Sequence, residues 1–192
     1  MARTARAAQH RTRPAPAAIA TAAARDAHPP AATIPAAPAP VPLDATDRRL
    51  LRHLQRDGRA SVVALAEAVG LSPTPLSRRI KRLEESGAIA RYAAVVDPAR
   101  VGLPLRAFVM VALATHDEAT VEAFHAALAR RPEVLAAHAM SGEMDYLLEV
   151  VAADLDAYGD FALRALLRMP GVKDTRSSFV LGTLKGGGEV PV

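Results

Sequence analysis

The sequence predicts an α+β protein built from two small domains. Three short helical segments come first, and four strand-like runs that alternate with two helices follow. The charge divides in the same way, since residues 43–92 hold ten Lys/Arg against six Asp/Glu and residues 93–192 hold nine against thirteen. About half of the 192 residues are apolar, which is enough for two separate cores.

The chain begins with a segment of unusual composition. Residues 1–42 contain 17 Ala and 8 Pro, with five Arg and one Asp. So few large apolar side chains cannot bury enough surface to offset the entropy of ordering, and we predict a disordered, basic tail. An organellar transit peptide is the alternative, although Ser is absent and Pro is too frequent for an amphipathic helix.

The first two helices follow this segment. The first has Asp44 or Thr46 as its cap and ends at Asp57-Gly58, and the second begins at Ser61 and ends at Gly70. Each helix has one apolar face, formed by Leu50, Leu51 and Leu54 in the first and by Val62, Leu65, Ala66 and Val69 in the second.

The third helix is basic. Ser72 is a favourable N-cap, Pro73 and Pro75 fall within the first turn, and Gly87 ends the helix. The spacing turns Leu76, Ile80 and Leu83 inward and leaves a basic, hydroxyl-bearing face outward. Three short helices with a glycine turn before a basic last one are typical of a helix-turn-helix unit, whose final helix enters the DNA major groove.

The outward face gives a set of candidate DNA contacts. We expect Arg78 and Arg79 to read base edges, and Lys81 and Arg82 to contact phosphates. A merely solvated helix face is the alternative interpretation of such a charge cluster. The predicted DNA-binding residues are Ser72, Thr74, Pro75, Ser77, Arg78, Arg79, Lys81 and Arg82.

In the second half of the chain we predict a hinge over residues 93–104, a domain over residues 105–185 and a flexible tail over residues 186–192. Tyr92 to Val96 is expected to be extended. Strands are predicted over 105–114, 134–140, 146–151 and 172–181, and helices over about 118–130 and 155–169. This βαββαβ order is that of a ferredoxin-like domain. The helices bury Val121, Phe124 and Leu128 in the first, and Leu155, Tyr158, Ala162, Ala165, Leu166 and Met169 in the second.

Composition excludes several classes of protein. There is no Cys, so disulfides, thiolate zinc sites and cysteine nucleophiles are absent. No two of the six His lie three to five residues apart, and we expect no metal or other cofactor. No apolar stretch reaches the roughly 18 residues that cross a bilayer, so a soluble, cytoplasmic protein with no membrane partner is expected.

Four stretches of this chain resemble the Lrp/AsnC family of bacterial and archaeal regulators. They are residues 43–47 with 54–59, 69–84, 141–146, and 169–172 with Thr175, and they occur within residues 43–185 in the family's order. The resemblance implies a winged or simple helix-turn-helix, a hinge and a domain that regulates amino-acid metabolism. It also implies homodimers that pair their sheets and assemble into octamers or other multiples.

The same resemblance implies an amino-acid effector bound between dimers. Asp145 would accept the ligand's ammonium group, backbone N–H groups near Gly142 would take its carboxylate, and Thr175 and Ser177 would add hydroxyls. The alternative is that Asp145 is only a turn residue before a strand. The turn reads Gly-Glu-Met-Asp, which departs from the family's common Gly-Asp-Phe-Asp. The predicted effector residues are Met140, Gly142, Glu143, Asp145, Thr175 and Ser177.

The expected function is sequence-specific regulation of genes of amino-acid metabolism or transport, through double-stranded DNA. An enzyme resembling the sirohaem decarboxylases is the alternative, but the sequence offers no nucleophile–base pair, phosphate loop or haem-ligand context. A pure oligomerisation module would not need the basic face of the third helix. We therefore expect a regulator and not an enzyme.

Overall fold

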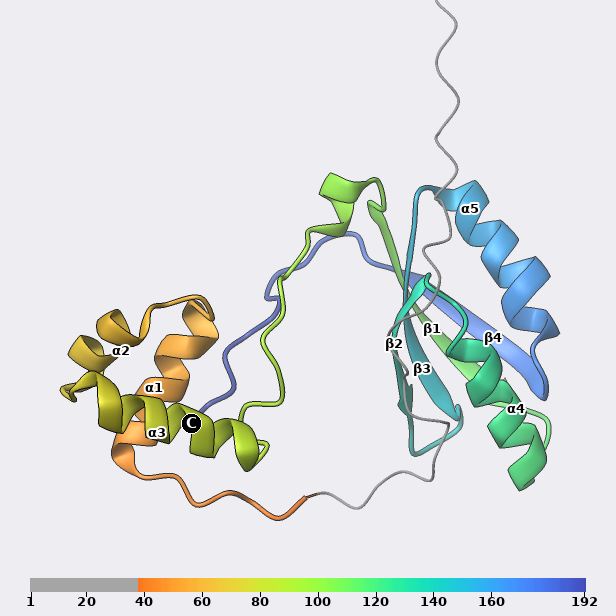
Figure 1. The fold of residues 1–192 in the computed structure, drawn as a ribbon. Helices are drawn as coiled ribbons and strands as arrows, with labels where there is room; N and C mark the ends of the chain where they lie inside the picture. The colour runs from red at the N-terminus through yellow and green to blue at the C-terminus, as the bar shows by residue number, and fades with distance from the viewer. Residues whose placement is uncertain (1–37) are drawn as a thin grey trace, which may run out of the picture.

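The computed structural model describes residues 38–192, so most of the predicted disordered tail lies outside the described residues. Figure 1 shows three helices on one side and a sheet with its helices on the other. The helices of the first group are α1 (Ala45–Arg56), α2 (Val62–Val69) and α3 (Pro73–Glu85). The described residues contain no helix long and apolar enough to cross a bilayer.

The three helices share one apolar core, as predicted. Ser61 caps α2 by accepting from the Ala64 N–H, and Asp44 caps α1 by accepting from the Asp47 N–H. The prediction that Val62 belongs to the apolar face of α2 was wrong, since Val62 is 38% exposed. Side chains tilt toward the N-terminus of a helix, so the first residue of α2 extends past the core. The buried apolar residues are Leu50, Leu51, Leu65, Ala66, Val69, Leu76 and Leu83.

The start of α3 follows the sequence, with one difference. Ser72 occupies the N-cap position with extended backbone, and Pro73 is the first helical residue. The Ser72 hydroxyl accepts no capping hydrogen bond, so the N–H of Thr74, which stands between two prolines that have none, stays uncapped. Gly87, with φ of 74°, follows the helix as expected.

The second group is a four-stranded antiparallel sheet with strand order β2-β3-β1-β4. Its strands are β1 (Leu105–Leu113), β2 (Val134–Ala139), β3 (Tyr146–Ala152) and β4 (Val172–Phe179). Helices α4 (Glu118–Leu128) and α5 (Leu155–Asp160) lie on the same face of the sheet (Figure 1). This arrangement confirms the predicted ferredoxin-like fold. A short 3-10 helix, Pro98–Val101, precedes β1.

The domain core lies between the sheet and these helices. Alternate residues of the central strand β1 are buried, and Val109 pairs with Leu148 of β3 on one side and with Ser177 of β4 on the other. Phe124 and Leu128 of α4 are buried against this face, as the helical spacing predicted.

The predicted second helix is interrupted. After α5 the chain forms a π-helical turn, Phe161–Ala165, and a 3-10 turn, Leu166–Arg168. The buried positions are therefore Tyr158, Phe161, Leu166 and Met169, with a step of five residues across the π turn. The prediction that Leu155 faces inward was wrong, because this side chain is 62% exposed.

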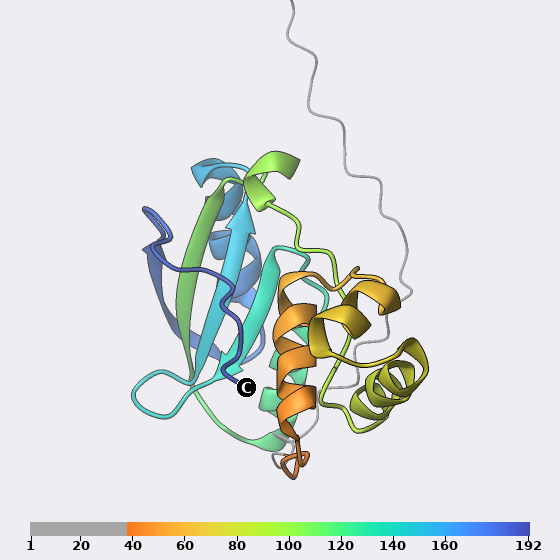
Figure 2. The same ribbon diagram turned by 90° about the vertical axis from the view of Figure 1, so that its left-hand side faces the viewer.

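Two segments connect the groups. Residues 90–97 form neither helix nor strand, and they lead from α3 to the sheet domain. Val95 in this segment is fully exposed. After β4 the chain returns to the helical group, and its end lies beside α1 (Figures 1 and 2). The segment 186–192, predicted to be a flexible tail, thus makes contacts in this structure.

Candidate nucleic-acid interface and effector turn

The outer surface of α3 is polar and basic. Thr74, Pro75, Ser77, Arg78 and Lys81 are all exposed. Ser77 Oγ donates to the Pro73 carbonyl at 3.0 Å, and Lys81 Nζ lies 3.6 Å from Glu85 on the same exposed helix face. Within residues 38–192 Arg78 has no ion-pair partner. Its guanidinium is therefore free to contact a ligand outside the chain.

The other two arginines of α3 pair with carboxylates from the start of α1. Arg79 Nη1 lies 2.5 Å from Asp44 Oδ2 and 2.9 Å from Asp47 Oδ1. Arg82 Nη2 pairs with the second oxygen of Asp47, whose side chain has no exposed surface. The two arginines that were predicted to read base edges therefore lie in different environments, because Arg78 faces solvent while Arg79 contacts α1.

Hydrogen bonding stabilises the charged form of Asp44. The backbone N–H of Asp47 and then the guanidinium of Arg79 lower the pKa of the Asp44 carboxyl to about 2. The Asp47 side chain accepts the Asp44 N–H in return, at 3.1 Å, which completes a capping box.

Sequence reasoning missed Asp47, although a signal was present. Asp47 stands three and four residues before Leu50 and Leu51, on the buried stripe of α1. A carboxylate at such a position needs a partner, and only a basic residue from another element can supply the charge. The α3 arginines belong to another element and were therefore candidates.

The predicted effector turn connects β2 to β3. Its ends are joined by the Met140 N–H, which donates to the Asp145 carbonyl at 2.8 Å, and Gly142 has φ of 123°, a conformation that favours glycine. The Met140 side chain is 48% exposed and that of Glu143 is 82% exposed. The turn therefore projects from the domain with its backbone accessible.

Asp145 is held at the base of this turn. Its Oδ2 accepts the Leu113 N–H at 2.7 Å, and its Oδ1 lies 2.7 Å from His116 Nε2. Partial burial opposes ionisation, but these two hydrogen bonds outweigh it, so the pKa of the Asp145 carboxyl lies below its ordinary value. The carboxylate is charged and oriented, and its exposed partner, His116, was not predicted.

The two hydroxyl residues of β4 lie on the helix-covered side of the sheet. Thr175 pairs with Val111 and Ser177 with Val109, both of which point into the core. Thr175 is near Asp145, whose N–H donates to the Val111 carbonyl. Ser177 lies farther along and accepts the Tyr158 hydroxyl at 2.5 Å. The structure thus groups Asp145 with Thr175 more closely than with Ser177.

Residues 38–192 contain no group of three or more His, Asp or Glu side chains that could hold a metal ion. The arrangement offers charge recognition: an exposed guanidinium on α3, and an oriented carboxylate below a turn of accessible amides.

Two family models match the chain. The AsnC-type helix-turn-helix domain matches residues 43–84, and the Lrp/AsnC ligand binding domain matches residues 106–190. Between them they cover the three helices except the last residue of α3, and the sheet domain except the first residue of β1.

Similar proteins extend over most of the chain. The DNA-binding transcriptional activator DecR of Escherichia coli K12 is 40% identical over 150 residues, which is 78% of this chain and 99% of that protein. The leucine-responsive regulatory protein of Salmonella typhimurium is 41% identical over 143 residues, 74% of this chain and 87% of that protein. A transcriptional regulator of Neisseria meningitidis, solved as a complex with L-Met, is 42% identical with a TM-score of 0.75 and covers 78% of this chain and 97% of its own.

Proposed function

The chain belongs to the Lrp/AsnC family of DNA-binding transcription regulators, and from this premise we propose that α3 reads DNA while the β2–β3 turn senses an amino acid. The family is one of regulators and not of enzymes, so the sirohaem-decarboxylase alternative is abandoned. The regulator would act in the cytoplasm, on genes of amino-acid metabolism or transport.

The exposed guanidinium of Arg78, which has no ion-pair partner within residues 38–192, carries the proposal for α3. Arg is the residue best suited to bidentate contact with guanine in the major groove. Thr74 and Ser77 lie one turn and one residue before it, and Lys81 follows at the next turn. Arg79 and Arg82 pair with Asp47 and would hold α3 in place. Their side chains are still 30% and 53% exposed, so they would also contact phosphates.

The N-terminus of α3 supports a phosphate contact. Pro73 and Pro75 have no N–H, so Thr74 supplies the one first-turn N–H that Ser72 leaves uncapped, and the hydroxyls of Ser72 and Thr74 lie at the same exposed end. Free N–H groups at a helix N-terminus bind phosphate well because the helix dipole adds positive potential there.

For the effector we propose an amino acid held by Met140, Gly142, Glu143, Asp145, Thr175 and Ser177. The L-Met complex of the Neisseria regulator supports this class of ligand. The ligand's ammonium would replace His116 at Oδ1 of Asp145, since the His116 side chain is 64% exposed and free to leave. The Leu113 N–H would keep its bond to Oδ2, so the carboxylate stays oriented.

We also propose homodimers that assemble into larger multiples, with the effector between dimers. The sheet face without helices carries Phe108 and Met110 of β1 and Leu147 of β3. Large apolar side chains on an open sheet face are often covered by another layer, and here they lie beside the Arg106–Glu149 ion pair. A second sheet would supply that layer.

One pair of measurements tests both halves of this proposal. A thermal-shift screen of the twenty amino acids is combined with gel-shift binding to the DNA upstream of the chain's own gene. We expect at least one amino acid to raise the melting temperature and to change DNA affinity. If DNA binds but no amino acid alters either quantity, the effector assignment is wrong, whereas absence of specific DNA binding overturns the assignment of α3.

A further inference from the structure

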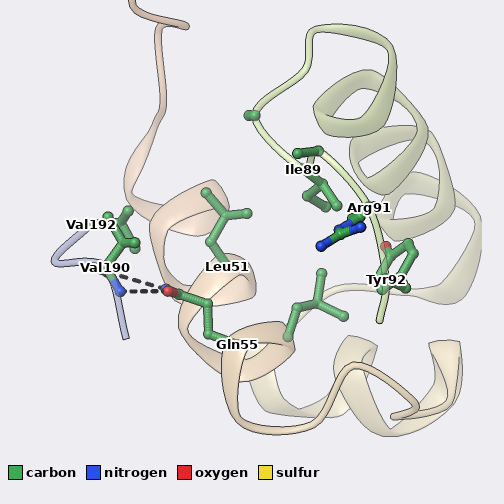
Figure 3. A pocket seen from close by; sticks show the side chains of 10 residues that line it. Leu51, Gln55, Ile89, Arg91, Tyr92, Val190 and Val192 are labelled. Atoms are coloured by element: carbon green, nitrogen blue, oxygen red, sulfur yellow. Dashed lines mark hydrogen bonds between the residues drawn. The ribbon is translucent and has the colours of Figure 1, made fainter. Parts of the chain in front are cut away.

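The last residues of the chain lie along one face of α1. Figure 3 shows Val190 and Val192 beside Leu51 and Gln55. The Val190 N–H donates to Gln55 Oε1 at 2.6 Å, and the Val190 carbonyl accepts from Gln55 Nε2 at 3.2 Å. One side-chain amide thus pairs with a single residue's backbone in both directions, as a neighbouring β-strand would.

Two further polar contacts flank this pair. Arg56 Nε lies 2.7 Å from Glu189 Oε1, and Arg52 Nη1 donates to the main-chain oxygen of Val192 at 2.7 Å. Positions 52, 55 and 56 are spaced by three and one, so their side chains share a helix face. Glu189, Val190 and Val192 of the peptide therefore meet three side chains of α1 in antiparallel order.

Apolar contact adds to these bonds. Val192 packs against the core of the three helices. A cavity of about 300 Å³ at this junction is lined in part by Leu51, Leu54, Ile89, Tyr92, Val190 and Val192. Pro191, between the two valines, has a restricted φ and no N–H to leave unpaired, so the segment loses little freedom on docking.

We infer that Arg52, Gln55 and Arg56 form a peptide-binding site on the reader domain, and that its ligand is the chain's own Glu189–Val192 segment. The ligand class is an extended peptide with an acidic residue followed by small apolar ones. Gly186, Gly187 and Gly188 precede it as a flexible tether. Such a short tether keeps the segment at an effective concentration of about millimolar, so weak contacts suffice.

Docking at this site restrains the two domains. β4 ends at Phe179, and the nine residues 180–188 span at most about 30 Å. The docked segment therefore limits how far the reader helices can move or turn from the sheet domain. Its consequence for DNA reading rests on the proposed function, whereas the docking itself does not.

Disulfide trapping tests the docking without DNA. The chain has no Cys, so Gln55→Cys/Val190→Cys introduces the only two thiols and leaves the Arg52 and Arg56 contacts in place. Arg49→Cys/Val190→Cys is the control pair, since Arg49 is an exposed position of α1 with no contact to the segment among the described hydrogen bonds. Mild oxidation is followed on denaturing gels.

We expect the first pair to oxidise at least about tenfold faster than the control and to migrate as a cross-linked monomer. Arg56→Glu in that background should slow oxidation several-fold, and adding Glu189→Arg should restore it. Equal rates for the two cysteine pairs would overturn the site. A covalent dimer as the main product would overturn the assignment of the chain's own segment as the ligand. If Glu189→Arg fails to restore oxidation in the Arg56→Glu variant, the Arg56–Glu189 contact is not part of the site.

Discussion

Asp47 Oδ1 lies 2.9 Å from Arg79 Nη1, and the side chain of Asp47 has no exposed surface. This ion pair joins the first turn of α1 to the middle of α3, and Arg82 adds a second link to the same carboxylate. The two arginines hold α3 by one side. Arg78, one residue before Arg79 and one turn before Arg82, has no ion-pair partner within residues 38–192 and is presented to solvent.

Removing the buried carboxylate should destabilise the three-helix unit. Asp47→Ala leaves Arg79 and Arg82 without their buried partner and should cost about 2 kcal/mol of unfolding free energy. Glu85→Ala, which breaks the exposed pair with Lys81, is the control and should change stability by less than about 0.5 kcal/mol. Urea unfolding measures both. Equal costs would show that the Asp47 pairs do not hold α3.

The Asp44 carboxyl gives a pH signature. Its pKa is about 2 in the folded protein against 3.8 for the free group, so its contribution to stability is present above pH 3.8 and is lost as pH falls toward 2. Wild type should melt higher than Asp44→Asn at pH 6, and the difference should shrink between pH 4 and 2. A difference in melting temperature that is independent of pH would contradict the assigned pairing.

Substitutions of Asp145 and His116 should have opposite effects on effector binding. Asp145→Ala should abolish the effector's influence on assembly and DNA affinity while ligand-free DNA binding stays near wild type. His116→Ala should raise effector affinity about two- to fivefold, because an exposed contact that competes with the ligand is worth only a few tenths of a kcal/mol to 1 kcal/mol. Isothermal titration with the amino acid that binds best decides between them. Weaker binding in His116→Ala would mean that His116 itself contacts the ligand.

The interrupted second helix makes a simple stability prediction. Phe161→Ala should cost about 3–4 kcal/mol because Phe161 is buried in the core, whereas Leu155→Ala should cost less than about 0.5 kcal/mol because Leu155 is exposed. Denaturant midpoints measure both. The reverse order would mean that the regular helix predicted from the sequence is the correct one.

Short-range patterns in the sequence predicted most of the fold. Helical spacing turned Leu76 and Leu83 inward in α3 and Phe124 and Leu128 inward in α4, and all four are buried. The π turn was missed because one extra residue in a helical turn leaves no periodic signal. Phe161 therefore went unassigned, and Leu155 was placed inside.

The candidate site was predicted less completely, for a different reason. The outward face of α3 follows from its own spacing, but the partner of each arginine does not. Asp47 and Arg79 are 32 residues apart in sequence, and Gln55 and Val190 are 135 apart. Such pairs depend on how the elements pack, so neither the sequestered Arg79 nor the docked C-terminal segment could be read from local patterns.

The most direct test of DNA reading by α3 is a fluorescence-anisotropy titration of Arg78→Ala. The ligands are a duplex selected by the wild-type protein from a random pool and a duplex of scrambled sequence, and Arg100→Ala, an exposed arginine of the 3-10 helix before β1, is the charge-matched control. Loss of a bidentate base contact should weaken binding of Arg78→Ala to the selected duplex about 5- to 150-fold, or roughly 1–3 kcal/mol, with little loss on the scrambled duplex. Binding of Arg78→Ala that equals that of Arg100→Ala on both duplexes would contradict the account.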